Sequence, residues 1–417
     1  MRILITGISS YLGGRAAQAL EKDPEVRTII GIDTTEPRHE FDRTEFIKVG
    51  ADNAAILRRI LNAAAVDTVL DTRLVDDPLK TALRRAHEVN VAGTAHLLAA
   101  CDDPNSHVTR LVFKSSAHYY GHDGANPAFL SEEAPPARAR TAIERDVALA
   151  EAAVREFAAR RGDRAVAILR VTDEIGGDGR GSHLALLALP IVPSILGFDP
   201  RLQFVHADDV VGAFVHVTSS RLEGVYNVAG DGVLALSEVV SLLGKQMLPI
   251  LPPWGSAFAA AQLRRVGLRV PVEMVRQLRF GRGLDNRRLK AAGYHYRYTS
   301  REAVLKLRAQ QRLRPLLGAG AQPYRYEREV EEFLRWSPSV QARNSDPSHA
   351  PEVEAPGTAG ETLTGFDALP LTELIDLISS LDPEALSMLR AYESAHRARP
   401  RVLEALDRTL YRKRSEK

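Results

Sequence analysis

The segment Thr6-Gly7-Ile8-Ser9-Ser10-Tyr11-Leu12-Gly13 decides the fold, because it joins a short apolar run to a helical stretch through a glycine turn. Residues 2–6 predict a strand, and residues 12–22 predict a helix. A turn of this kind points a helix N-terminus at the end of the strand, where it can bind a pyrophosphate. Gly7 and Gly13 permit the close approach of the backbone, and Ser10 stands where a middle glycine is usual.

The same alternation of strand and helix continues beyond this turn. Apolar runs at residues 28–32, 45–49 and 67–70 predict strands, and residues 54–65 predict a helix. Strands that alternate with helices at this spacing indicate a Rossmann-type, doubly wound parallel sheet in the α/β class. Such sheets bind ligands at the carboxyl ends of their strands.

An acidic residue follows the second predicted strand. Asp33 comes about twenty residues after the glycine turn, where a carboxylate can accept hydrogen bonds from both hydroxyls of a ribose. The negative charge would also repel a 2′-phosphate, so the pattern favours NAD over NADP. The alternative is that Asp33 only begins a turn.

Composition limits the remaining possibilities. The 417 residues carry a formal net charge of +2, from 55 basic and 53 acidic side chains, which does not favour nucleic acid as the main partner. A single cysteine, Cys101, excludes an intrachain disulfide framework and a multi-cysteine metal site, so we expect no metal and a cytoplasmic location. The longest apolar run, residues 184–198, contains two prolines and is too short to cross a bilayer.

Several motifs follow one another along about the first three quarters of the chain: residues 6–13, Ala51-Asp52-Asn53, Asn90-Val91-Ala92-Gly93-Thr94, and residues 111–121, 204–210, 224–228 and 284–289. Together they resemble the extended short-chain dehydrogenases/reductases, the group of NAD-dependent epimerases and dehydratases that act on nucleotide sugars and related substrates. The resemblance implies NAD as the cofactor, bound by Gly7, Ser10, Tyr11, Leu12, Gly13, Asp33, Asp52, Asn53 and Asn90.

In that family a Ser or Thr, a Tyr and a Lys carry out the chemistry. A lysine cation lowers the pKa of the phenol, which must donate or accept a proton near neutrality, and also holds the nicotinamide ribose. Ser116 matches the serine position. The glutamate that follows the Tyr-x-x-x-Lys pattern resembles Glu151, which places Ile143 at the tyrosine position and Val147 at the lysine position. The chain has no lysine between Lys114 and Lys245 and no tyrosine between Tyr120 and Tyr226, so a shifted alignment cannot restore the pair.

Other residues near the predicted site leave alternatives open. Arg73 follows the fourth strand, where it could reach cofactor phosphates or be a solvated loop residue. His118 has a suitable unperturbed pKa for proton transfer, and Tyr120 follows closely, although packing and turn formation are the more ordinary roles for both.

Two classes of function therefore compete. The first is an NAD-binding protein with a degenerate catalytic site, a pseudoenzyme with a sensor or scaffold role. The second is an active nucleotide-sugar epimerase, dehydratase or reductase that uses an atypical acid or base. Both admit a nucleotide sugar or another small molecule as ligand.

The chain is expected to contain three parts. Residues 1–336 form the NAD-binding epimerase/dehydratase-like domain, with the nucleotide-binding part at about 1–170 and a substrate-side part at about 171–336. Residues 337–365 are poor in large apolar residues and predict a disordered linker. Residues 366–412 predict a small helical module that could bind a protein partner, and the family resemblance suggests a homodimer through the helices near Asn90 and Glu151.

Overall fold

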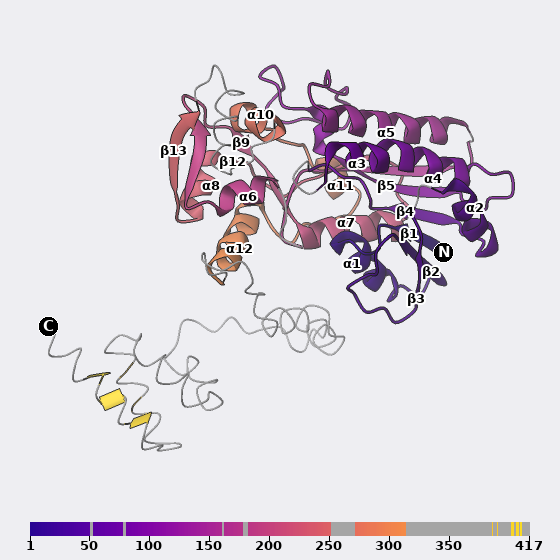
Figure 1. The fold of residues 1–417 in the computed structure, drawn as a ribbon, viewed down its shortest axis with the longest axis horizontal. Helices are drawn as coiled ribbons and strands as arrows, with labels where there is room; N and C mark the ends of the chain where they lie inside the picture. The colour runs from indigo at the N-terminus through magenta and orange to yellow at the C-terminus, as the bar shows by residue number, and fades with distance from the viewer. Residues whose placement is uncertain are drawn as a thin grey trace. The chain divides into compact units, whose positions relative to one another are not determined.

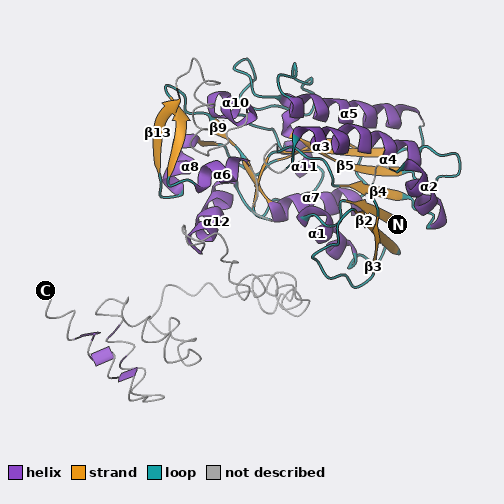
Figure 2. Cartoon of the chain, in the orientation of Figure 1, coloured by secondary structure: helices purple, strands orange, loops and turns teal. Residues whose placement is uncertain are grey.

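Seven parallel strands form the central sheet of the computed structural model, in the order β11-β6-β5-β4-β1-β2-β3 (Figures 1 and 2). The strands are β1 (Arg2–Thr6), β2 (Thr28–Asp33), β3 (Thr44–Lys48), β4 (Thr68–Asp71), β5 (Arg110–Ser116), β6 (Ala165–Val171) and β11 (Gly224–Val228). The order reverses between β1 and β4, which places a ligand crevice at the carboxyl ends of these two strands. The predicted doubly wound parallel sheet is confirmed.

Helices cover both faces of this sheet, and each face has its own apolar core. One core includes side chains of α2 (Ala54–Ala63), α4 (Thr94–Cys101) and α5 (Ala142–Arg160), and the other includes those of α1 (Tyr11–Leu20), α7 (Ala207–Ser219) and α11 (Arg287–Ala291). Strand β1 contributes side chains to both cores: Leu4 packs in the first core, and Ile3 and Ile5 pack in the second. Burial on both faces explains why the strands read as continuous apolar runs.

A smaller α/β part lies beside the carboxyl end of the sheet (Figure 1). It has a third core, formed mainly by α6, α8, α10 and α12, and contains three two-stranded sheets. Its elements are β7 (Asp173–Ile175), α6 (Ser182–Ala188), β8 (Ile191–Ile195), β9 (Arg201–Leu202), β10 (Phe204–His206), β12 (Leu234–Ala235), α8 (Leu236–Leu242), β13 (Gln246–Leu251), α10 (Val272–Phe280) and α12 (Ser300–Leu313).

Short helical segments complete the nucleotide-binding part, namely α3 (Leu83–His87), the π-helical turn η1 (Glu88–Gly93) and the 3-10 turn η2 (Ala117–Tyr120). Helix α5 begins with a reciprocal cap. The Glu144 backbone N–H donates to Thr141 Oγ1 at 3.2 Å, and the Thr141 N–H donates to the Glu144 carboxylate at 3.2 Å. This capping box fixes where α5 starts, and therefore where Ile143 and Val147 lie.

The structure describes residues 1–50, 53–77, 81–160, 162–177, 182–251 and 272–313, and single helical residues between 386 and 410. The chain divides into two units, residues 1–323 and 324–417. In the second unit, Leu386, Val402, Leu406 and Leu410 are buried and Arg390 pairs with Asp407. The predicted linker at 337–365 lies outside the described residues.

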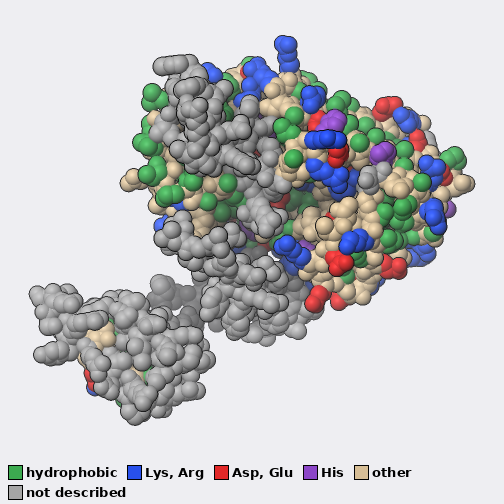
Figure 3. Space-filling view, viewed as in Figure 1, with side chains coloured by type: hydrophobic (Ala, Val, Ile, Leu, Met, Phe, Trp, Pro, Cys, Tyr) green, Lys and Arg blue, Asp and Glu red, His purple; other side chains and the backbone are tan. Residues whose placement is uncertain are grey.

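Acidic and basic side chains are interspersed on the face of the first unit shown in Figure 3. Several form exposed ion pairs, such as Lys48 with Glu36 and Arg160 with Glu156. No helix in the described ranges is both long enough and apolar enough to span a bilayer. Within the same ranges, no cluster of three or more His, Cys, Asp or Glu side chains is placed to hold a metal ion.

Candidate functional site

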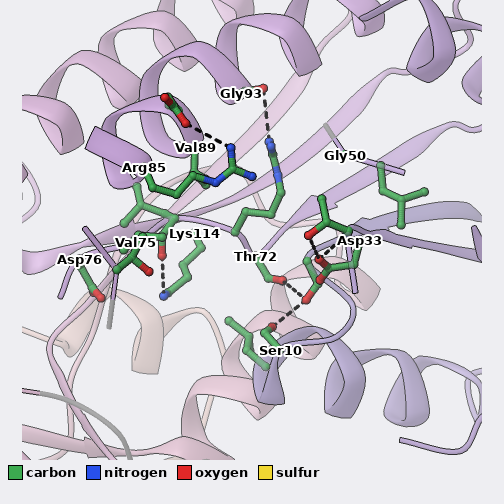
Figure 4. A pocket seen from close by; sticks show the side chains of 18 of the residues that line it. Ser10, Asp33, Gly50, Thr72, Val75, Asp76, Arg85, Val89, Gly93 and Lys114 are labelled. Carbon is green, nitrogen blue, oxygen red and sulfur yellow. Dashed lines mark hydrogen bonds and ion pairs between the residues drawn. The ribbon is translucent and has the colours of Figure 1, made fainter. Parts of the chain in front are cut away.

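A cavity of about 540 Å³ opens at the carboxyl ends of β1, β2, β4 and β5 (Figure 4). Its volume lies in the range of pockets that bind small molecules and cofactors. The residues that line it come from the glycine turn, from the ends of these strands and from η1: Gly7, Ser10, Tyr11, Leu12, Ile32, Asp33, Thr34, Val49, Gly50, Thr72, Arg73, Leu74, Val75, Asp76, Thr81, Arg85, Glu88, Val89, Ala92, Gly93, Lys114 and Glu174.

The glycine turn is closed by its own hydrogen bonds. Ser10 is the N-cap of α1, and its Oγ accepts the Gly13 N–H at 3.0 Å and donates to the Gly7 carbonyl at 2.7 Å. Gly7 has a φ of +78°, and a Cβ on Gly13 would lie 2.3 Å from the Gly7 carbonyl oxygen. Both positions therefore require glycine, and the serine replaces a glycine without opening the turn.

Asp33 lies at the end of β2, on the rim of this turn. Its carboxylate accepts the Ser9 N–H at 3.1 Å and the Thr34 N–H at 2.7 Å, and the residue lines the cavity. These contacts fix the carboxylate next to the N-terminus of α1, which carries a partial positive charge. One cavity thus brings together an anion-binding helix end and a carboxylate able to accept ribose hydroxyls.

Asn53 and Asn90, which were also predicted to bind the cofactor, do not line the cavity. Asn53 is the N-cap of α2, where its Oδ1 accepts the Ile56 N–H at 3.1 Å, and Asp52 lies outside the described residues. Asn90 is buried and holds the loop after β4, since its amide bonds the backbone N–H of Val75 at 2.8 Å and the carbonyl of Val75 at 2.6 Å. Asn90 thus holds Val75, which lines the cavity, in place.

Arg73 enters the cavity as half of an ion pair with Asp71. Its Nη2 lies 2.7 Å from Asp71 Oδ2, and the two side chains are 13% and 2% exposed. Burial alone would raise the pKa of Asp71, but the Arg73 charge, with hydrogen bonds from Arg73 and Thr6, holds this pKa below its ordinary value. Arg73 is therefore not a solvated loop residue. Its positive charge is paired with the Asp71 carboxylate in the wall of the cavity.

Ser116, Ile143 and Val147, which the sequence resemblance places at the Ser, Tyr and Lys positions, are all buried. Ser116 ends β5, is buried, and accepts the His118 N–H through Oγ at 3.4 Å. Ile143 and Val147 lie in the first turns of α5, are fully buried, and belong to the same apolar core as Tyr119 and Tyr120. Neither Ile143 nor Val147 lines the cavity.

Tyr120 takes part in a buried hydrogen-bond network with Asn227 and Arg170. Its hydroxyl donates to Asn227 Oδ1 at 2.8 Å and accepts from Arg170 Nη1 at 2.7 Å. Burial raises the pKa of Tyr120 to about 12, despite the opposing charge of Arg170. Arg170 also forms a bidentate ion pair with Glu151. This geometry agrees with a structural role for Tyr120.

Lys114 is a cavity residue that was not predicted from the sequence. Lys114 lies on β5 and lines the cavity, and its Nζ donates to the Leu74 carbonyl at 3.1 Å. A signal was available in the alternation of the strand, because residues 112, 114 and 116 point to one face of the sheet. Lys114 therefore shares its face of β5 with Ser116.

A second polar cluster lies next to Ser116 and includes residues that are distant in sequence. The rings of His118 and His122 are 5.8 Å apart, Arg282 Nη1 donates to the Ala117 carbonyl at 2.7 Å, and Arg276 donates to the His122 carbonyl. Among the described residues, both nitrogens of His122, Nδ1 of His118 and the Nε atoms of both arginines are buried without a hydrogen-bond partner. We name this set, His118, His122, Arg276 and Arg282, the basic cluster.

Burial determines the charge of the two imidazoles. It lowers the pKa of His118 and lowers the pKa of His122 well below its ordinary value, with the charge of Arg282 acting in the same direction. Both rings are therefore neutral near pH 7, and the positive charge of the basic cluster resides on the two arginines.

The neutral His122 predicts a loss of stability in acid. In the unfolded chain the imidazole takes up a proton below about pH 6.5, whereas the folded protein does not, so the unfolded state binds more protons and stability falls as the pH is lowered. The expected slope is about 1.4 kcal/mol per pH unit below pH 6.5 until the folded pKa is reached. Urea unfolding of wild type and His122→Gln between pH 8 and pH 5 measures this slope.

The His122→Gln variant should lose less stability in acid than the wild type. His96→Gln on α4 is the control. The His96 side chain is exposed and meets water in both the folded and the unfolded state, so this substitution should leave the loss of stability in acid unchanged. An equal acid loss in wild type and His122→Gln would contradict the assignment of a neutral, buried His122.

Comparison with known proteins identifies relatives for most of the first unit. The model of the NAD dependent epimerase/dehydratase family matches residues 3–229. An uncharacterized protein of Mycobacterium tuberculosis strain H37Rv is 31% identical over 310 residues, which are 72% of this chain and 81% of that protein. An uncharacterized protein of Sinorhizobium fredii is 24% identical over 319 residues, 73% of this chain and 76% of that protein.

Solved structures show the same fold. UDP-glucose 4-epimerase from Thermotoga maritima, with UDP-glucose, has a TM-score of 0.59 at 15% identity and covers 75% of this chain and 99% of its own. MoeE5 in complex with UDP-glucuronic acid and NAD has a TM-score of 0.56 at 21% identity and covers 74% of this chain and 98% of its own. At these identities the likeness concerns the fold.

Proposed function

This chain belongs to the NAD-dependent epimerase/dehydratase family, and we propose that it binds NAD in the cavity described above without the family's tyrosine-dependent hydride and proton transfer. The proposal rests on a contrast between the residues that face the cavity and the residues of α5. The glycine turn and Asp33 face the cavity together, whereas Ile143 and Val147 are buried in the apolar core. On this proposal the groups that recognise the cofactor are kept, whereas α5 contains neither a tyrosine nor a lysine.

The residues present fit a dinucleotide. The N-terminus of α1, with Ser10, Tyr11 and Leu12 in the wall, would hold the pyrophosphate, and the Asp33 carboxylate would accept the hydroxyls of the adenosine ribose. When bound, NAD can accept and return a hydride. Without a phenol to take up the accompanying proton, the chain would bind the cofactor as a sensor or a scaffold does.

The basic cluster supports a second, anionic ligand. Arg276 and Arg282 have buried Nε groups that lack partners among the described residues, and such donors suit phosphate or carboxylate oxygens. MoeE5 and the Thermotoga epimerase are described with UDP-sugars, so a nucleotide sugar is the ligand class we propose for this chain. Tyr120 and Glu151 would only support the walls around it.

An active enzyme remains the second candidate, because of one observation. The backbone N–H of His118 donates to Ser116 Oγ, and the neutral His118 ring can accept a proton. Such an enzyme would use His118 in place of the tyrosine. A UDP-sugar-dependent change in nicotinamide absorbance that His118→Gln abolishes would establish this candidate and overturn the non-catalytic role.

Asp33→Asn tests the cofactor assignment. The asparagine keeps an oxygen for the Ser9 N–H but removes the charge that a ribose diol would bind, so NAD affinity should fall about tenfold or more. The affinity for NADP should fall less, because the repulsion of the 2′-phosphate is also removed. Isothermal titration of wild type and variant with both cofactors gives the two ratios.

The matched control is Asp42→Asn, since Asp42 is an exposed acid that does not line the cavity. It should bind NAD as the wild type does. Absence of NAD binding by the wild type at millimolar cofactor would refute the proposal. Equal losses for NAD and NADP in Asp33→Asn would refute the role of the carboxylate.

A further inference from the structure

Lys114 places a positive charge in the wall of the cavity. It lies on β5, whereas the lysine of the family's Tyr-x-x-x-Lys pattern is expected on α5. The side chain is half-buried on β5, and its Nζ is held 3.1 Å from the Leu74 carbonyl, a neutral acceptor. An ammonium has three protons to donate, so this single bond leaves capacity for further acceptors. The bond to Leu74 fixes the position of the charge in the cavity wall.

The position of Lys114 relative to Asp33 indicates what it could bind. Figure 4 shows Asp33 and Gly50 at one end of the cavity and Lys114 and Asp76 at the other, with Ser10 and Thr72 between them. If Asp33 binds the adenosine ribose and the N-terminus of α1 binds the pyrophosphate, the second ribose of a dinucleotide extends toward Lys114. The two ends would then each present an ionised group to a ribose.

We propose that Lys114 is a positioning residue that holds the nicotinamide-side ribose of the cofactor, in place of the cation that position 147 no longer provides. This inference rests on the proposed NAD binding. A charge-assisted hydrogen bond from the ammonium to the ribose hydroxyls is stronger than a neutral one, which makes lysine effective here. Val147 faces the apolar core, so β5 rather than α5 supplies the charge.

The test uses three ligands that differ in the far half of the cofactor: NAD, ADP-ribose and ADP. NAD and ADP-ribose contain the second ribose, and ADP lacks it. Lys114→Met is expected to bind NAD and ADP-ribose about tenfold more weakly and ADP with unchanged affinity. Asp33→Asn should weaken all three, because each ligand contains the adenosine ribose.

Two further variants make the titration decisive. Lys114→Gln keeps a donor for the Leu74 carbonyl while removing the charge, so it should show the same selective loss even if Lys114→Met folds poorly. Lys290→Met removes an exposed lysine that pairs with Asp231 outside the cavity, and should bind all three ligands as the wild type does.

The outcomes separate this inference from the function on which it rests. If the wild type binds NAD and the Lys114 variants bind all three ligands unchanged, or lose ADP affinity equally, the inference is wrong and NAD binding stands. If the wild type binds none of the three ligands, the proposed function and the inference both fail.

Discussion

Glu151→Gln is expected to lower the free energy of unfolding by about 3–5 kcal/mol, because it leaves a buried arginine without its counter-charge. Arg170 Nε and Nη2 lie 2.9 and 2.8 Å from the two Glu151 carboxylate oxygens, and both side chains are 0% exposed. Ser115 Oγ also donates to Glu151 at 2.5 Å. A glutamine can replace one acceptor oxygen but neither the charge nor the second acceptor.

The loss should extend beyond the pair itself. Arg170 lies over the ring of Tyr119 at 3.5 Å and donates to the Tyr120 hydroxyl, so its displacement disturbs the packing of η2 against β6. Chemical denaturation monitored by circular dichroism measures the change. Arg301→Gln is the control, because it breaks an exposed ion pair with Glu238 and should cost at most about 1 kcal/mol. Similar losses in the two variants would contradict the structural role of Glu151.

The main features of the fold could be predicted because they depend on local pattern. The strand-helix alternation of residues 1–70 and the glycine turn determine a parallel sheet, and parallel strands bring their carboxyl ends to one edge. Gly7, Ser10 and Asp33 therefore meet in one cavity, as expected. The predicted and observed positions of these residues agree because each residue is placed by its own strand.

Residues whose role depends on tertiary contacts could not be predicted in this way. Asn90 holds the Val75 backbone because the loop after β4 folds over η1, and nothing local to Asn90 indicates that contact. The basic cluster joins residues more than 150 positions apart, since Arg276 of α10 reaches the carbonyl of His122. Lys114 differs from these, because its strand period alone indicates its orientation.

The reason that chemistry is expected to be absent lies in the packing of α5, and this packing can be tested directly. Val147→Lys is expected to lower the free energy of unfolding by about 3 kcal/mol or more, because it introduces an ammonium at a fully buried apolar position. Leu149→Lys is the matched control on the same helix. Leu149 is 46% exposed, so this variant should change stability by no more than about 0.5 kcal/mol.

The opposite result would change the interpretation of the site. If Val147→Lys were as stable as the wild type and bound NAD more tightly, the new ammonium would have to reach the cofactor, and position 147 would open toward the cavity. The family's catalytic geometry would then persist with only its side chains exchanged, and adding Ile143→Tyr should restore some nicotinamide-dependent turnover. A destabilised V147K variant, with unchanged stability in L149K, would instead show that α5 has repacked as core. In that case the proposed loss of the Tyr/Lys pair would follow from the surrounding packing, and two substitutions could not reverse it.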